Sequence, residues 1–259
     1  MKLRGLLLIL AITATAHTAE LTNAAAVLEF VLRQSAQYNA FAADFIQTQW
    51  LLDTPTQMTG TIHFQKPAQT RLTMHVGATG APPQQVVAVM GADQILWQET
   101  ASSGPPTAMK MDLTTLPTNH PAAAMLKNPF DTVDPQRFVA RIRNDYTQTL
   151  TGTAELNGQK MYILDGTLNP KRKLPGHLAM LTRDQGRQRL LIGQTDGFVH
   201  QVQQFDSTNT NLIMTIEFTN LKLNPDLPAD LFRYEPTAGV RVIDMTAILL
   251  QLMKSTQKP

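Results

Sequence analysis

Short runs with a two-residue hydrophobic period recur through most of the 259-residue chain and are separated by turn residues. They include FAADFIQTQWLL from Phe41, TIHFQ from Thr61 and QVVAVM from Gln85. Such alternation is typical of strands that pack one face on a core. Asn157-Gly158 is the strongest hairpin signal between two such runs. Roughly ten strands follow one another without intervening helices, which predicts an antiparallel sheet with helices on one face, in a single domain.

Helical periodicity is confined to a few places. LTNAAAVLEFVLRQSAQY, from Leu21, is predicted as a helix that Thr22 or Asn23 caps. VRVIDMTAILLQLMKST, from Val240, is predicted as a strand that passes into an apolar-faced helix. Residues 100–135 are rich in turn signals around a short helical piece, PAAAMLKN, and are predicted to form a lid or a binding loop.

The first residues have the layout of a secretory signal peptide. Lys2 and Arg4 precede an apolar run from Leu6 to Ile12, and an A-x-A site follows at residues 14–16. The expected division is a signal peptide at 1–16 and one domain at 17–259. The formal charge of +2 includes Lys2 and Arg4, so the mature chain has a charge of 2 − 2 = 0, which removes support for nucleic-acid binding. The sequence contains no cysteine to carry a lipid anchor, so we expect a soluble periplasmic protein.

The sequence lacks the common catalytic motifs. It contains no G-x-S-x-G, H-E-x-x-H, P-loop or G-x-G-x-x-G pattern. Its six histidines are separated from one another and from carboxylates, so neither a catalytic nor a metal role is expected for them. We therefore expect no enzyme activity, no metal and no cofactor, and we rank an envelope hydrolase below the binding functions.

Apolar side chains on the predicted strands allow two interpretations. They could fill a core between helices and sheet, or they could line a cavity for a long apolar ligand, with methionines adapting to its shape. Periodicity alone does not separate the two. On the second interpretation the candidate ligand-binding residues are Phe45, Trp50, Phe64, Leu72, Met74, Val87, Val89, Trp97, Ile163, Met214 and Phe218.

The order of several motifs resembles the LolA-like family of periplasmic lipoprotein carriers. An N-terminal helix and FAADFIQTQ are followed by GTIHFQKP, by Arg71 on the next strand, and by VAVMGADQILW. Far downstream, IEFTNLKLNPDLPADLFRYEPTAGVRVID resembles the closing segment of that family. The resemblance covers residues 39–244 and implies an α+β fold. The expected architecture is an incomplete antiparallel barrel of roughly ten to eleven strands with helices packed on or capping its concave face.

The resemblance also implies a function and partners. Such carriers take up the acyl chains of lipoproteins at the inner membrane, from a releasing complex, and deliver them to an outer-membrane acceptor. By position, Arg71 would hydrogen-bond backbone carbonyls on the lid side and hold the empty cavity closed, while Lys66 is expected to be exposed beside Pro67. The alternatives are a lipid-sensing regulator of envelope stress with the same fold and a carrier of another lipid. A monomer is expected.

Overall fold

The computed structural model describes residues 21–51, 54–77, 84–101, 104–117, 133–170 and 185–255. The predicted signal peptide and the helical piece PAAAMLKN lie outside these ranges. GHLAMLTRD, residues 176–184, which its flanking turn residues and apolar side chains predict as a further strand, also lies outside them. Whether residues 100–135 act as a lid therefore stays a prediction.

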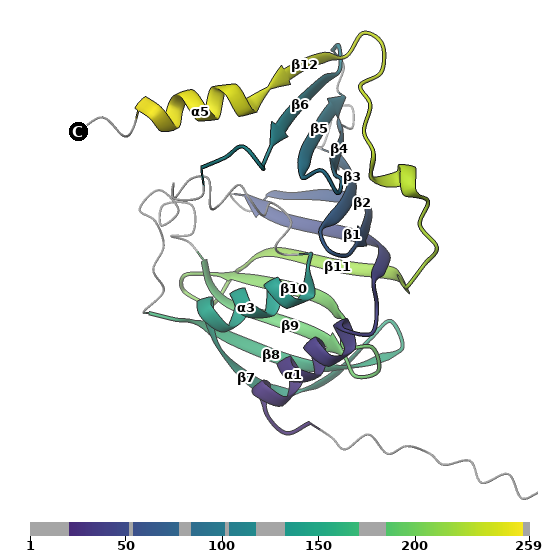
Figure 1. Cartoon of the computed structure of the whole chain (residues 1–259). Coiled ribbons are helices and arrows are strands. Elements are labelled where there is room, and N and C mark those ends of the chain that lie inside the picture. Colours follow the sequence, from purple (N-terminus) through teal and green to yellow (C-terminus); the bar gives the residue numbers. More distant parts are fainter. Residues whose placement is uncertain are drawn as a thin grey trace, which may run out of the picture.

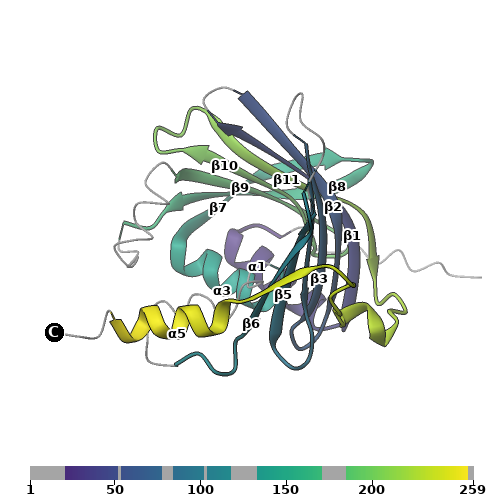
Figure 2. The same cartoon turned by 90° about the horizontal axis from the view of Figure 1, so that it is seen from above.

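Twelve strands form one curved sheet that is not closed (Figures 1 and 2). Its order is β12-β6-β5-β4-β3-β2-β1-β11-β10-β9-β8-β7, and every neighbouring pair is antiparallel except β12 and β6. The edge strands β12 and β7 do not pair with each other in the described part of the chain. This arrangement confirms the predicted incomplete antiparallel barrel. The strands are β1 (Ala40–Leu51), β2 (Thr54–Gln65), β3 (Gln69–Gly77), β4 (Gln84–Met90), β5 (Ile95–Ala101), β6 (Thr107–Asp112), β7 (Tyr146–Leu156), β8 (Gln159–Leu168), β9 (Gln185–Gly193), β10 (Val199–Asp206), β11 (Leu212–Leu223) and β12 (Arg241–Asp244).

The strand count exceeds the expected ten to eleven because the turn-rich region contributes a strand of its own. TAMKMD, at 107–112, pairs with β5 on one side and with β12 on the other. Its flanking Gly and Pro residues had dominated the sequence pattern there. The hairpin predicted about Asn157-Gly158 is confirmed between β7 and β8, and the turn residues Gly91–Gln94 likewise join β4 and β5 in a hairpin. Asn157 and Gly158 both have positive φ, of 52° and 77°, as a two-residue hairpin turn requires.

Two helices lie inside the curve of the sheet (Figure 2). Helix α1 (Ala24–Ser35) was predicted, and the side chain of Asn23 caps it by accepting a hydrogen bond from the Ala26 amide at 2.9 Å. Helix α3 (Pro135–Asp145) was not predicted, although Pro135 occupies its first turn and Asp134 caps it. Phe138, Val139 and Ile142 form its buried face. Because β7 begins at the next residue, α3 leads into the edge strand of the sheet without a loop.

The main core lies between these helices and strands β7 to β10. Val27, Leu28 and Val31 of α1 meet the buried face of α3, and both helices rest on Leu164, Leu190 and Ile192. A smaller cluster joins the C-terminal helix α5 (Met245–Ser255) to β4 and β6 through Met253, Met90 and Leu113. The predicted strand-to-helix tail is thus confirmed. None of the described helices is long and apolar enough to cross a bilayer.

Candidate ligand-binding cavity

A cavity of about 420 Å³ opens between the concave face of the sheet and helices α1 and α3. Its size lies in the range of roughly 300–1,000 Å³ that is usual for small-molecule sites. Side chains from both helices and from β1, β2, β7, β9, β10 and β11 contribute to its wall. The wall is formed by Val31, Tyr38, Phe41, Ile62, Val133, Pro135, Phe138, Arg141, Asp145, Tyr146, Gln188, Gly197, Phe198, Val199, Val202, Gln204, Met214, Ile216 and Phe218.

One end of the cavity is aromatic. The ring of Phe198 lies edge-on to Phe41 and to Phe218, with centroids 5.2 Å and 5.8 Å apart, and Tyr38 meets Phe41 at 6.3 Å. Burial, with the nearby charges of Asp134 and Asp196, raises the pKa of the Tyr38 phenol. Tyr38 therefore stays protonated and uncharged, and this end of the cavity presents aromatic carbon to a ligand.

Lys66 supports this aromatic end from outside. It was expected to be exposed, but its Nζ donates a 2.6 Å hydrogen bond to the Ser35 carbonyl at the end of α1 and lies 5.3 Å from the centre of the Tyr38 ring. The ammonium thus joins the end of β2 to the C-terminus of α1, where carbonyl groups lack partners within the helix. The expectation of an exposed Lys66 was wrong because α1 ends directly above it.

The other end of the cavity is polar. On the concave face, Gln204 of β10 pairs with Gln188 of β9, Gln188 pairs with Gly166 of β8, and Gly166 pairs with Gln148 of β7. We call Gln148, Gln188 and Gln204 the glutamine row. Val199, at the aromatic end, precedes Gln204 by five strand residues, or about 17 Å at 3.3–3.4 Å per residue. The cavity thus has an aromatic end and an amide end.

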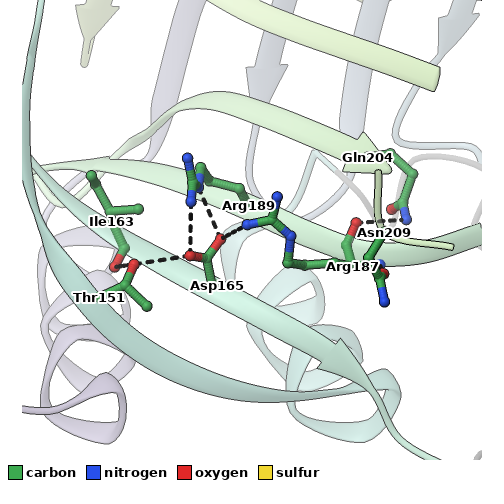
Figure 3. Close-up of polar contacts among 7 residues, drawn as sticks. All are labelled: Thr151, Ile163, Asp165, Arg187, Arg189, Gln204 and Asn209. Atoms are coloured by element: carbon green, nitrogen blue, oxygen red, sulfur yellow. Dashed lines mark hydrogen bonds and ion pairs between the residues drawn. The ribbon is translucent and has the colours of Figure 1, made fainter. Parts of the chain in front are cut away.

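The amides of the glutamine row differ in how their hydrogen bonds are satisfied. Gln204 accepts from the Tyr146 hydroxyl at 3.2 Å and donates to the carbonyls of Gly186, Arg187 and Phe205, the Arg187 contact being visible in Figure 3. Among the described residues, Oε1 of Gln188 and both amide atoms of Gln148 are buried without a partner. Gln148 lies against Gly166, where an added Cβ would be 2.3 Å from its Nε2.

Some residues predicted to bind ligand lie at or beside this cavity. Met214 and Phe218 are part of its wall. The Phe64 ring is tilted by 32° against Phe41 with centroids 5.4 Å apart, and the Phe45 ring lies 6.5 Å from Phe218, so both adjoin residues of the wall without being part of it. Leu72 packs against the cluster around Phe41 and Phe64. Met74 is paired with Gly60, on the same face of the sheet but beyond the wall residues.

Other predicted residues lie on the convex face. Ile62 of β2 lines the cavity, so its neighbour His63 points the other way, and Arg71, Val89 and Trp97 follow His63 across β3, β4 and β5. Val87 has the same parity as Val89. Trp50, nine residues after Phe41 on β1, and Ile163, next to the core residue Leu164, also lie on the convex face.

A segment from Pro228 to Pro236 covers part of this convex face, and we call it the outer segment. It contains the 3-10 turn η1 (Ala229–Phe232). Nη1 of Arg71 donates to the Leu231 carbonyl at 3.2 Å, the Tyr234 ring lies 5.2 Å from Trp97, and the Tyr234 hydroxyl bonds to Glu99. Val89, which pairs with Arg71 on one side and with Trp97 on the other, is only 1% exposed. The outer segment therefore covers apolar residues of β4 and β5 on the face of the sheet away from the cavity.

The outer face of β7 to β9 carries a polar network (Figure 3). Arg189 donates to both carboxylate oxygens of Asp165 at 2.9 Å, Arg187 adds a contact at 3.1 Å, and Thr151 donates from β7. Burial acts to raise the pKa of the Asp165 carboxyl, but the bonds from Arg189 and Thr151 and both guanidinium charges hold it below its usual range. The network joins three strands at the sheet edge opposite the cavity.

Neither a protein-family model nor a curated protein sequence matches the chain. Solved structures do match it. LprF from Mycobacterium bovis is 13% identical over 80% of this chain and 98% of that chain, with a TM-score of 0.47. The complex of Pseudomonas aeruginosa MucA and MucB gives 12% identity over 80% of this chain, with a TM-score of 0.43. The match covers only 61% of that chain, so this protein spans less than two thirds of it.

A third similar structure is the LolA superfamily protein NE2245 from Nitrosomonas europaea. It is 12% identical over 80% of this chain and 97% of that chain, with a TM-score of 0.33. Because identities are this low, the ligand of the chain has to be inferred from its own cavity. Solved structures similar to this chain thus include a member of the LolA superfamily.

Proposed function

We propose that this protein is a periplasmic carrier that holds acyl chains of lipids or lipoproteins in its cavity and moves them from the inner to the outer membrane. The observation that carries the proposal is the cavity between the sheet and helices α1 and α3, with its wall of aromatic and aliphatic side chains. Such a wall is complementary to an apolar chain, because it offers mostly carbon surface to the ligand.

The free energy available from such a site is sufficient without a charged anchor. Each buried CH₂ contributes about 0.8 kcal/mol, so ten methylenes contribute on the order of 8 kcal/mol before the entropy cost of binding is subtracted. Because the wall consists mostly of carbon, affinity for one chain would depend little on salt. Release would follow from any motion that exposes the chain to an apolar acceptor.

The proposed binding residues are those of the sequence prediction that face the cavity, Met214 and Phe218, together with Phe41, Phe198 and Phe138. Gating by Arg71 remains part of the proposal, and its observed bond to Leu231 means that it would act through the outer segment. An inner-membrane releasing complex and an outer-membrane acceptor are the partners this function requires. The predicted signal peptide supports export to the periplasm.

The decisive experiment compares a substitution that fills the cavity with a control substitution of the same size on the opposite face of the sheet. Met214→Trp places a bulky ring in the wall, whereas Thr215→Trp places the same ring on the convex face one residue later. Mature wild-type protein and both variants are added to spheroplasts of the native host. The supernatant is then assayed for acylated lipoproteins in complex with each protein, and each protein is examined for bound lipid by native mass spectrometry.

A carrier should release lipoproteins as wild type and as Thr215→Trp, and Met214→Trp should release at least tenfold less. Lipid on the purified protein without lipoprotein release would move the function to lipid sensing. If wild type neither carries lipid nor binds an acyl probe, the proposal is wrong.

A further inference from the structure

We infer that the ligand is an amphiphile whose head group is uncharged and rich in hydrogen-bond donors, and that the glutamine row binds this head while the chain points to Phe41 and Phe198. This inference rests on the proposed function, since it names the class of acyl ligand that the same cavity takes. The observation that carries it is the unpaired amide oxygen of Gln188 in the wall of the cavity, at the end away from the aromatic rings.

Gln188 is the central residue of the argument. It is 6% exposed, lines the cavity, and its Oε1 has no partner among the described residues. A buried carbonyl without a partner costs about 1–3 kcal/mol, a cost that a hydroxyl or amide donor of a ligand would remove. Gln148, two strands away in the same row, has a buried donor and a buried acceptor without a partner among the described residues, although it lies next to the cavity wall and is not part of it.

The chemistry of the row favours an uncharged head. A glutamine amide offers one acceptor oxygen and two donors and carries no net charge, so it suits hydroxyl and amide groups best. Arg141 and Asp145 also line the cavity, but each already interacts with another residue. They are also of opposite sign, so they supply no net charge to the amide end.

The layout of the cavity fixes the orientation. Gln204 is held by four hydrogen bonds and forms a rigid wall beside Gln188. The row continues across the sheet to Met214 of β11 and Gln49 of β1, which are paired with each other. At the opposite end the wall is made by Tyr38, Phe41 and Phe198, which offer ring surface to a chain. Head and chain therefore have separate binding surfaces about 17 Å apart along β10.

The test compares two lipids with the same chain and the same ester. Monopalmitoylglycerol carries two hydroxyls that methyl palmitate lacks. Their affinities are measured by displacement of a pyrene-labelled fatty acid from wild type, Gln188→Met and Gln148→Met. Methionine keeps the length of glutamine and removes its amide. The matched control is Gln203→Met, which makes the same change on β10 but on the convex face, opposite Arg189.

Wild type should bind monopalmitoylglycerol about tenfold more tightly than methyl palmitate, the factor expected from one or two hydrogen bonds. Gln188→Met and Gln148→Met should lose this preference while keeping the affinity for methyl palmitate, and Gln203→Met should behave as wild type. Melting temperatures report on folding, and the Gln188→Met and Gln148→Met variants should melt no lower than wild type because each loses an unpaired polar group.

Two results would separate this inference from the proposed function. Equal binding of both lipids by wild type, unchanged in the variants, overturns the inference and leaves the acyl carrier intact. A variant that loses both lipids equally also overturns it, because the row would then support the chain and not the head. Binding of neither lipid by wild type contradicts the proposed function itself.

Discussion

Arg71 on β3 donates a hydrogen bond from Nη1 to the carbonyl oxygen of Leu231, 160 residues later in the chain. The bond fixes the outer segment on the convex face, over Val89 and Trp97. A region that the sequence suggested as part of a cavity wall is therefore covered by the chain itself.

Arg71→Leu should loosen the outer segment. A hydrogen bond from a charged donor contributes about 1.5–3 kcal/mol when buried, and the partial exposure of Arg71 reduces the expected loss in unfolding free energy to about 1 kcal/mol. Urea unfolding gives the free energy, and limited proteolysis should show faster cleavage within 228–236. Arg233→Leu, which removes an exposed arginine of the same segment, is the control and should leave both unchanged.

The titration of His63 should respond to the same substitution. Burial is the main cause that lowers the pKa of His63, and the charge of Arg71, its cross-strand partner, lowers it further. In Arg71→Leu the pKa of His63 should rise part of the way toward its ordinary value of about 6.5. NMR titration of the imidazole measures it, and an unchanged pKa would remove Arg71 as a cause.

The lowered pKa of His63 determines how this residue makes the stability of the protein depend on pH. The folded state binds fewer protons at His63 than the unfolded state does, so its contribution to stability is lost as pH falls from about 6.5 toward the folded pKa. Arg71→Leu should make this loss smaller. Unfolding in urea between pH 7 and pH 5 would check it, and a steeper loss in the variant would contradict the argument.

Lys66→Met should weaken the junction between α1 and β2. The substitution keeps most of the aliphatic stem but removes the bond to Ser35 and the charge over the Tyr38 ring, at an expected cost of about 1–2 kcal/mol. Lys160→Met, at an exposed position on β8, is the control and should cost little. Equal stability of both variants would show that the Ser35 contact does not hold α1.

Asp206 lies at the turn between β10 and β11, and its protonation should lower the stability of the protein at acidic pH. Desolvation acts to raise the pKa of the Asp206 carboxyl. Hydrogen bonds from Thr208, Asn211 and Thr210 outweigh it and lower this pKa to about 2. Its contribution to stability is present above about pH 4, the ordinary pKa, and is lost as pH falls toward 2.

In Asp206→Asn this part of the acid destabilisation should disappear, and in Thr208→Val it should become smaller because loss of one bond moves the folded-state pKa of Asp206 back toward its ordinary value. Urea midpoints measured from pH 5 to pH 2 test both variants. Parallel curves for wild type and Asp206→Asn would mean that Asp206 does not contribute.

Local signals in the sequence predicted much of the fold. Asn157-Gly158 and Asn23 act through adjacent backbone, so the hairpin and the helix cap could be predicted without tertiary context. Helix α3 was missed although Asp134 and Pro135 mark its start, because it follows a turn-rich region and leads into β7 without a loop. Strand β6 was missed for a related reason, since it is short and its partner β12 lies far along the chain.

The faces of the sheet could not be predicted in the same way. Val89 and Phe64 are both almost fully buried, one under the outer segment and the other behind the cavity wall. When both faces of a strand are covered, alternation no longer tells which face is inside. The glutamine row was missed because its members are far apart in sequence and become neighbours only through strand register.

Gly166 sits in that row between Gln148 and Gln188, and the side chain of Gln148 occupies the space that a methyl group at 166 would need. A relative with alanine at 166 would have to turn its Gln148 amide elsewhere, even with all three glutamines retained. Ligand choice in such a set of proteins would then vary with a residue that never touches the ligand, so selectivity should be compared at position 166 as well as along the wall.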